Sequence, residues 1–488
     1  MPGEGSTNGG ATLHAAGASL AEWMDRQYGL SAAAMLQSIS AVHLVKERPG
    51  FGQTIRPARG SVLASPVIAA YDPDPDYFFH WLRDSAVVID AVRTLIEGGA
   101  GDPGLHACVE DFIRFSLALG DLDGRAVVTS GGAGLAPDPK FQQYMRPTRE
   151  LSEAFGGRIS GETRFNPDGT LDVTKWARPQ HDGPALRALA MLRFWPTSVF
   201  DEDEARDAAR RLIEADLAFT HRHWRKPSFD IWEEESGHHY YTRLVQQAAL
   251  ADGAQWFVLM GDAQRAGAYW RASREIADEL DGHWDAGKGF YLSRIGVAAG
   301  SSQKELDIAV ILAVIHARRQ DGPHSVSDPK AQATLARLEH LFAGAYPINR
   351  SLPGDRGAAM GRYQGDVYYS GGAYYFSTLA AAEFFFSLAG AVARRIRTNS
   401  LSPDDLSSIK ALVGAEQALD APGAFDALLK RGDSFMATVR AYTPASGDLS
   451  EQFDGATGQQ TSAKNLAWSH AAFITAVAAR RAALRARV

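Results

Sequence analysis

The sequence predicts an all-α protein whose helices pack in pairs around a ring, with an inner and an outer layer. Residues 185–195 and 374–392 are apolar on almost every side, which is typical of helices buried on all sides. Residues 205–219 repeat apolar side chains at intervals of three and four, which indicates an amphipathic helix with one wet face. The alternation of these two kinds of segment indicates two concentric layers.

Helix start signals support this interpretation. The tripeptides that begin at Ser327 and Ser402 each join a capping residue to a proline, a combination typical of a first helical turn. About twelve or thirteen helical segments are expected between residues 19 and 486. Strands are expected to be few, with short candidates at residues 125–129 and 289–295.

The chain shows no internal boundary. No Pro/Ser-rich linker divides it and no repeat of about 34 residues is visible, which disfavours a repeat array. We therefore expect one domain over residues 19–488, preceded by a disordered lead-in at residues 1–18.

Composition and charge exclude several classes of protein. The 488 residues carry a net charge of −7, whereas nucleic-acid binding needs a basic surface. The single cysteine, Cys108, cannot form a disulfide within the chain, and no motif has metal-ligand spacing, so we expect no cofactor or metal. The chain starts without a signal-like segment, and Glu383 interrupts its most apolar stretch, which predicts a cytoplasmic protein without a membrane span.

Long segments without helical periodicity join the helices. They cover residues 121–175, 226–241, 354–372 and 443–462, and they are rich in Trp, Tyr, Asp, Glu and Arg. Loops of this length inside a compact domain are usually functional. Because aromatic faces stack on sugar rings and charged groups bond hydroxyls, this composition favours a carbohydrate ligand.

A series of motifs occurs in these loops and at the starts of the helices that follow. They read DYFFHWLRDS at 76–85, WARPQHDGPALRA at 176–188, DIWEEESGHHYYT at 230–242, GRYQGDVYY at 361–369, TLAAAE at 378–383, SEQF at 450–453 and LAWS at 466–469. In this order they resemble glycoside hydrolase family 15, the glucoamylase family, over residues 19–485. The chain resembles a bacterial-type member without a starch-binding module, so raw starch granules are not an expected substrate.

The resemblance implies an (α/α)6 toroid and an inverting exo-hydrolase that releases β-glucose from non-reducing ends. Glycoside hydrolysis needs two carboxyl groups on opposite sides of the scissile bond. The resemblance assigns Glu233 as general acid and Glu451 as general base, which only a folded ring of loops could bring together. Without it, Glu233 to Glu235 would be interpreted as a solvated acidic turn.

The same resemblance implies a set of substrate-binding residues. Arg83 and Asp84 would grip the 4- and 6-hydroxyls of the terminal glucose, because a guanidinium and a carboxylate can bond vicinal hydroxyls. Glu234 would bind the sugar in the first plus subsite. The amide of Gln452 could hold a water molecule. The other expected binding residues are Tyr77, Trp81, Trp176, Trp232, Arg362, Tyr368 and Trp468, whereas Asp182 and Arg187 are expected to be structural ion-pair partners.

Departures from the fungal pattern leave the preferred linkage open. They lie at His80, Leu82, His181, Gly365, Ala373-Tyr374 and residues 172–175. The alternatives are an α-1,6-glucosidase directed at isomaltose or dextran, or a trehalase. A non-catalytic glucoamylase-like regulatory domain and an inverting phosphorylase are weaker alternatives, because both candidate carboxylates are retained.

Overall fold

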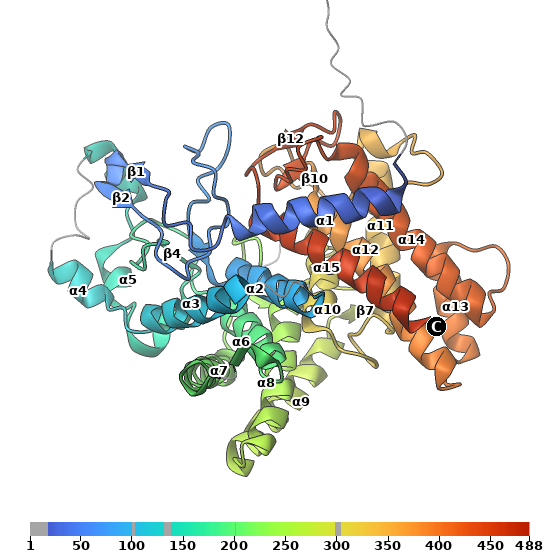
Figure 1. Ribbon diagram of the computed structural model, residues 1–488, viewed down its shortest axis with the longest axis horizontal. Helices are drawn as coiled ribbons and strands as arrows, with labels where there is room; N and C mark the ends of the chain where they lie inside the picture. The colour runs from blue at the N-terminus through green and yellow to red at the C-terminus, as the bar shows by residue number, and fades with distance from the viewer. Residues whose placement is uncertain (1–17, 100–102, 131–137, 201, 298–303, 488) are drawn as a thin grey trace, which may run out of the picture.

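The core of the protein is a closed ring of helices. The computed structural model describes residues 18–99, 103–130, 138–200, 202–297 and 304–487 (Figure 1). In this part of the chain the inner helices are α2 (Leu82–Glu97), α6 (Asp182–Phe194), α8 (Tyr240–Leu259), α10 (Ala309–Ala317), α12 (Tyr375–Arg397) and α15 (Ala467–Ala486). Each packs against the next, and α15 closes the ring on α2.

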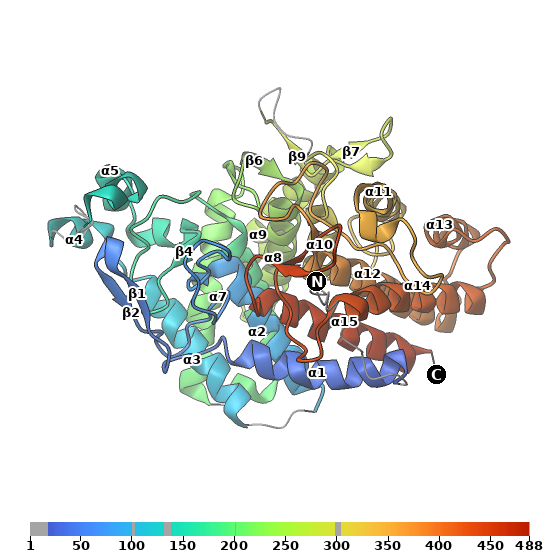
Figure 2. The ribbon, with the colours of Figure 1, turned by 90° about the horizontal axis from the view of Figure 1, so that it is seen from above.

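An outer helix precedes each inner helix along the chain. The outer helices are α1 (Leu20–Leu36), α3 (Pro103–Leu119), α7 (Asp203–His223), α9 (Ala263–Asp281), α11 (Pro329–Ala345) and α14 (Ala421–Tyr442). For example, α1 lies along α15, and α9 packs against α8 (Figures 1 and 2). This arrangement is the (α/α)6 toroid, so the expected fold class is confirmed. The expected lead-in falls almost wholly on residues 1–17, which lie outside the described residues.

The remaining helices are short or peripheral. They are α4 (Gly124–Thr129), α5 (Thr148–Ser152) and α13 (Pro403–Val413), with 3-10 turns at Pro49–Phe51, Pro139–Tyr144, Gly156–Gly161, Ser198–Phe200 and Pro347–Asn349. The strand expected at residues 125–129 is wrong, because this segment is α4. The side chain of Asp123 caps its first turn by accepting a hydrogen bond from the Arg125 N–H at 2.9 Å. Its valines pack on a small apolar cluster, so tertiary packing overrides their preference for strands.

The strands are two to four residues long and pair antiparallel. They are β1 (Lys46–Arg48) with β2 (Gln53–Ile55), β3 (His80–Trp81) with β4 (Arg164–Phe165), β5 (Ser228–Phe229) with β6 (Ser236–His239) and β9 (Arg294–Ile295), β7 (Trp284–Asp285) with β8 (Phe290–Tyr291), and β10 (Ala373–Tyr374) with β11 (Gln452–Phe453) and β12 (Gln460–Thr461). The candidate at 289–295 is confirmed, since it contains β8 and β9. These pairings fasten the long loops together, and Figure 2 shows β6, β7 and β9 gathered at one side of the helices.

The predicted helix boundaries and the buried character of the inner layer are confirmed. Helix α11 begins after Asp328, whose side chain accepts from a backbone N–H of the first turn, and α13 begins after Ser402 in a capping box. Helix α12 is long and apolar enough to cross a membrane by length and composition, but its most apolar stretch is 94% buried within the fold. It is therefore a core helix of the ring.

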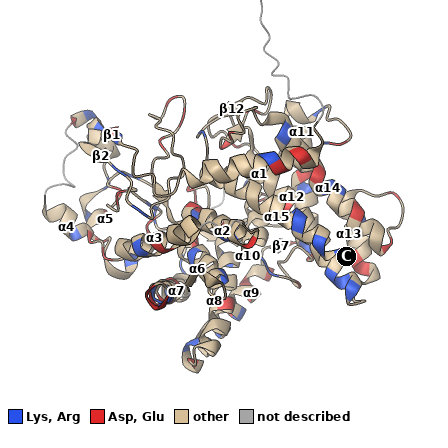
Figure 3. Cartoon of the chain, viewed as in Figure 1, with Lys and Arg blue, Asp and Glu red and all other residues tan. Residues whose placement is uncertain are grey.

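Charged residues of both signs are distributed along the helices (Figure 3). Basic residues gather toward the end of α15, where Arg480, Arg481 and Arg485 lie in its last turns. Cations there interact favourably with the partial negative charge of a helix C-terminus. The opposite, N-terminal ends of α2, α12 and α15 all contribute residues to one cavity, which is described next.

Candidate active site

A cavity of about 230 Å³ lies at the N-terminal ends of the inner helices. Its lining residues are Tyr77, Trp81, Arg83, Asp84, Trp176, Ile231, Trp232, Glu233, Glu234, Arg362, Tyr368, Phe376, Glu451, Leu466 and Trp468. Sites for drug-sized ligands typically measure about 300–1,000 Å³, so this one suits a small ligand or the end of a chain. A larger cavity of about 830 Å³ opens among the far ends of α2, α10, α12 and α15, and none of the expected site residues lines it.

Glu233 is presented by a tight turn between β5 and β6. Its backbone has a φ of 65°, a left-handed conformation that costs a non-glycine residue about 1–3 kcal/mol. Asp230 holds the turn: its Oδ1 accepts hydrogen bonds from the backbone N–H groups of Glu234 at 2.7 Å and Glu235 at 2.9 Å. Lys304 pairs with the other oxygen of Asp230 at 3.2 Å. The turn thus directs the Glu233 carboxyl group into the cavity.

Several donors fix the orientation of the Glu233 carboxyl group. Its Oε1 accepts from the indole N–H of Trp81 at 2.9 Å and from Arg83 Nη2 at 3.0 Å. Its Oε2 accepts from the indole N–H of Trp176. These donors come from β3, α2 and the loop that precedes α6, so the position of this group depends on segments more than 50 residues away in the sequence.

Glu451 lines the same cavity immediately before β11. Its Oε1 accepts from the Tyr77 hydroxyl at 3.2 Å, and its Oε2 accepts from the Ser462 hydroxyl. Burial raises the pKa of Glu451 to about 7, although Ser462, Arg362 and Tyr77 act in the opposite direction. A carboxyl group that titrates near neutrality is suited to accept a proton from water.

The inner end of the cavity is lined by charged groups at the start of α2. Arg83 lies 3.2 Å from Asp84 and 3.5 Å from Asp182, and all three residues are buried. Burial raises the pKa of Asp84 to about 6, and the neighbouring Glu233 and Asp182 act in the same direction against Arg83. Arg83 Nε has no hydrogen-bond partner among the described residues, and Asp84 Oδ2 has the ion pair with Arg83 but no hydrogen bond. Buried polar atoms without partners indicate a place where a polar ligand binds.

A second cluster surrounds Glu234 at the mouth of the cavity. Its carboxylate accepts from Arg362 at 3.0 Å and from the Tyr363 hydroxyl at 2.6 Å, and it pairs with Lys304. Arg362 is oriented by Asp366, which accepts from its Nε at 2.6 Å. The Glu234 carboxylate is therefore surrounded by two cations and a hydroxyl donor.

Stacked aromatic rings form one wall. Phe376 lies between Trp468, at 4.6 Å with an interplanar angle of 9°, and Trp232, at 6.1 Å and 23°. The indole N–H of Trp232 donates to Asp307 at 2.8 Å, which holds the ring. The indole N–H of Trp468 is buried and has no hydrogen-bond partner among the described residues.

The structure brings together all of the expected site residues except Gln452. Gln452 is fully buried, and its amide donates to the Tyr368 carbonyl at 3.1 Å and to the Tyr374 hydroxyl at 2.6 Å, while its oxygen accepts from Ser370. It lies on β11, where successive side chains point to opposite sides, so it turns away from the cavity that Glu451 faces. The expectation that its amide holds a water molecule in the site is wrong.

Other residues of the site carry no strong signal in the sequence. Ile231, Phe376 and Leu466 line the cavity, but each looks like an ordinary core residue. Lys304, Tyr363 and Ser462 support the carboxylates from distant loops. Ile231, Tyr363 and Leu466 lie inside the motifs quoted above, which is the signal that could have found them, whereas Lys304, Phe376 and Ser462 lie outside every motif.

The two residues expected to be structural differ in their surroundings. Arg187 forms a bidentate ion pair with Asp216, with both contacts at 2.8 Å, which joins α6 to α7 away from the cavity. Asp182 instead lies beneath Arg83 at the inner end of the site. In the part of the chain that the structure describes, no three His, Cys, Asp or Glu side chains cluster so as to hold a metal ion.

Two buried carboxyl groups on one small polar cavity, carried by an (α/α)6 toroid, are the groups that a glycoside hydrolase needs. The sequence model described as glycosyl hydrolases family 15 matches residues 50–478. The chain belongs to glycoside hydrolase family 15.

Relatives and solved structures agree with this assignment. The chain is 27% identical to glucoamylase 1 of Rhizopus oryzae, covering 96% of this chain and 72% of the relative. It is 28% identical to a probable glucoamylase of Schizosaccharomyces pombe, covering 95% and 93%. The glucoamylase structure from Hormoconis resinae has a TM-score of 0.74 at 27% identity, covering 95% of this chain and 74% of that one. The Hypocrea jecorina glucoamylase has a TM-score of 0.76 at 26% identity, covering 95% and 72%.

Proposed function

We propose that the protein is an inverting, exo-acting α-glucosidase of the glucoamylase type. It removes terminal α-1,4-linked glucose from the non-reducing ends of oligosaccharides or polysaccharides and releases β-D-glucose. The observation that carries this proposal is the joint presence of Glu233 and Glu451 on a cavity whose inner end is closed by Arg83 and Asp84.

The chemistry divides between the two carboxyl groups. Glu233 donates a proton to the glycosidic oxygen as the bond to the anomeric carbon breaks. Glu451 accepts a proton from a water molecule as this water attacks the opposite face of the same carbon. Because Glu451 activates a water instead of bonding to the sugar, the product has the configuration opposite to that of the substrate.

The inner end of the cavity explains the exo mode of action. The atoms of Arg83 and Asp84 that lack hydrogen bonds can bond the hydroxyl groups of one terminal glucose through charge-assisted hydrogen bonds. These residues and Asp182 are buried among the inner helices, so a sugar chain cannot continue past them. Only a chain end therefore reaches the two carboxyl groups.

The anomeric configuration of the first product tests the proposal. Proton NMR within minutes of mixing with maltotriose should show β-glucose before mutarotation equilibrates the anomers. Initial release of α-glucose would exclude inversion and with it the role of Glu451 as base. No glucose release from any α-glucoside would favour the non-catalytic alternative.

The preferred linkage is tested separately. The α-1,6-glucosidase and trehalase alternatives share Glu233, Glu451, Arg83 and Asp84 and differ in the groups that contact the leaving sugar. Initial rates on maltose, isomaltose, panose and trehalose at equal concentration should be highest for the α-1,4 bond of maltose. A higher rate on isomaltose or trehalose would replace the α-1,4 assignment while leaving the reaction type intact.

A further inference from the structure

Trp176 is the most exposed of the groups that hold Glu233. The residue is 37% exposed, yet its indole N–H must keep a fixed direction to donate to Glu233 Oε2. It lies on a loop without regular structure between β4 and α6. No residue of the described ranges packs on the exposed part of this ring, so a neighbouring group on its buried side must hold it in place.

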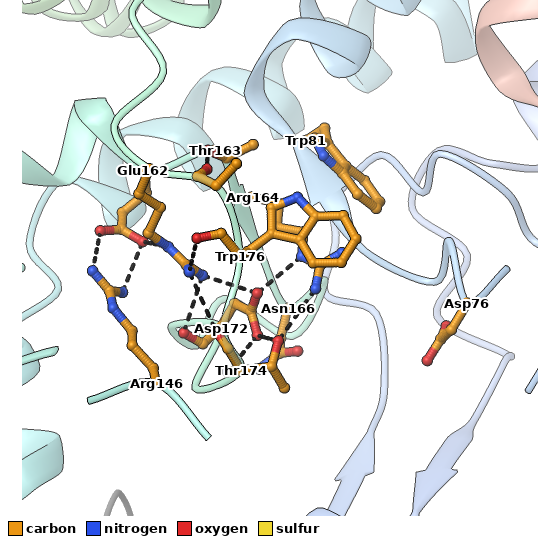
Figure 4. A network of polar contacts seen from close by, with 12 residues as sticks. Asp76, Trp81, Arg146, Glu162, Thr163, Arg164, Asn166, Asp172, Thr174 and Trp176 are labelled. Atoms are coloured by element: carbon orange, nitrogen blue, oxygen red, sulfur yellow. Dashed lines mark hydrogen bonds and ion pairs between the residues drawn. The ribbon is translucent and has the colours of Figure 1, made fainter. Parts of the chain in front are cut away.

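Arg164 provides that support. Its guanidinium carbon lies 3.4 Å from the centre of the Trp176 ring, as Figure 4 shows for these two residues, and 3.9 Å from the centre of the Phe79 ring, so the cation contacts two aromatic faces. Arg164 is 1% exposed and pairs with Trp81 in the register of β3 and β4. Two indoles donate to Glu233, those of Trp176 and Trp81. Arg164 contacts the first and is the strand partner of the second.

A buried ionic network fixes the plane of the Arg164 guanidinium. Asp172 Oδ2 accepts from Arg164 Nε at 2.9 Å and from Arg178 at 2.9 Å, and Thr174 accepts from Arg164 at 3.2 Å (Figure 4). Burial would raise the pKa of Asp172, but the two guanidinium groups hold it well below its usual range. Asp172 and Thr174 belong to the segment 172–175 that departs from the fungal pattern.

We propose that Arg164 is a positioning residue for the general acid: its guanidinium, fixed by Asp172, stacks on Trp176 and sets the direction of the indole N–H that holds Glu233. A cation over an indole face is an attractive contact whose strength depends on ring geometry. Loss of this contact lets the exposed indole turn, and Glu233 loses one of its donors. This inference rests on the proposed function.

The test compares two substrates that need the general acid to different degrees. In Arg164→Met, kcat on maltotriose should fall about 10- to 100-fold with little change in KM, because a small displacement of a catalytic group costs about this much. Hydrolysis of α-glucosyl fluoride should fall less than about threefold, since fluoride needs little protonation to leave.

Arg146→Met is the matched control. Arg146 is equally buried in the same network, but it pairs with Glu162 at 2.8 Å and makes no contact with Trp176 among the described residues (Figure 4). Its loss should leave the ratio of the two rates unchanged. An equal loss on both substrates in Arg164→Met, or the same altered ratio in Arg146→Met, would overturn the proposal.

A second variant covers the case in which Arg164→Met does not fold. Asp172→Asn keeps the size of the side chain but removes the charge that orients Arg164, and the ratio of the two rates should change in the same direction. An unchanged ratio in folded Asp172→Asn would contradict the proposal. An unmodified enzyme that releases no glucose from maltotriose would instead refute the proposed function, before any variant is compared.

Discussion

At the scale of single residues, the two carboxyl groups proposed as acid and base differ in what surrounds them. Glu233 is held by N–H donors, including a guanidinium, whereas Glu451 accepts from the hydroxyl groups of Tyr77 and Ser462, and burial raises its pKa to about 7. Different surroundings are how two groups of the same chemistry take different roles at one pH. Two predictions follow from these surroundings.

The first concerns the general acid. Glu233→Gln should lower kcat on maltotriose by about 10²–10⁴-fold, because glutamine has no proton to give to the leaving oxygen. The loss on α-glucosyl fluoride should be smaller. Steady-state kinetics on both substrates measure the two factors, and an unchanged rate on maltotriose would remove Glu233 from the mechanism.

The second concerns pH. Glu451 must be ionised to act as base, so kcat/KM should rise as the pH increases through about 7, where this group titrates. Ser462→Ala removes a hydrogen bond that favours the ionised form, and the acid limb of the profile should move to higher pH. Ser446→Ala is the control, because its hydroxyl donates to Asp448 at 2.9 Å and not to Glu451. If the acid limb of the pH profile keeps its position in Ser462→Ala, the hydrogen bond from Ser462 does not set the pKa of Glu451.

At the scale of elements, the starts of the inner helices and the loops before them carry the site. Trp81, Phe376 and Trp468 lie within two residues of the starts of α2, α12 and α15. Short antiparallel strands fasten the loops to one another, as in the pairing of Tyr374 with Gln452. The ring thus supplies a rigid base, and the loops supply the reacting groups.

The turn that carries Glu233 gives a prediction at this scale. Asp230→Ala removes the acceptor for two backbone N–H groups and should lower kcat about 10- to 100-fold by displacing Glu233. Asp230→Asn keeps an acceptor oxygen and loses only the charge opposite Lys304, so it should retain most of the activity. Kinetics of both variants, with circular dichroism to confirm folding, decide the point. Equal activity in the two variants would mean that Asp230 does not hold the turn.

At the scale of the whole molecule, buried ion pairs connect neighbouring helices of the ring. Asp90 on α2 contacts Arg93 at 2.8 Å, Arg193 of α6 at 3.2 Å and Arg318, at the end of α10, at 3.0 Å. Burial would raise the pKa of Asp90, but these guanidinium groups hold it well below its usual range. The ionised carboxylate is therefore favoured in the folded protein.

Asp90→Asn should destabilise the ring by about 3 kcal/mol at neutral pH, because it removes the buried anion that pairs with Arg93, Arg193 and Arg318. A lowered folded-state pKa stabilises the protein above the unfolded pKa of about 3.9, and this contribution is lost as the pH falls further. The difference in the free energy of unfolding between the unmodified protein and Asp90→Asn should therefore shrink between about pH 5 and pH 3, a range that brackets the unfolded pKa of aspartate.

Denaturant unfolding at neutral and acidic pH measures this difference. Asp433→Asn is the control: Asp433 pairs with Arg480 at 2.6 Å, but both side chains are partly exposed, so the change should cost less than about 1 kcal/mol. An Asp90→Asn cost as small as that of the control would show that the buried cluster does not stabilise the ring.

Much of the molecule can be predicted from local pattern. Helical periodicity, caps and uniformly apolar segments predict the layers, because these signals depend on residues that are only a few positions apart in the sequence. The errors arise where a distant segment decides the outcome. Residues 125–129 form a helix because of a cap and a packing cluster, and Gln452 turns inward because β11 pairs with its neighbours.

The sequence by itself determined the helical ring, the family motifs and the chemical types of the catalytic pair. Only the tertiary structure decided which side chains meet. Glu233 and Glu234 are adjacent and chemically alike, yet a left-handed backbone turn places one among indole donors and the other among cations. Arg164 gained its place beneath Trp176 in the same way, through strand pairing and a buried ionic network. The physical reason is that these contacts join segments far apart in the chain, and they form only when the ring closes and brings its loops together.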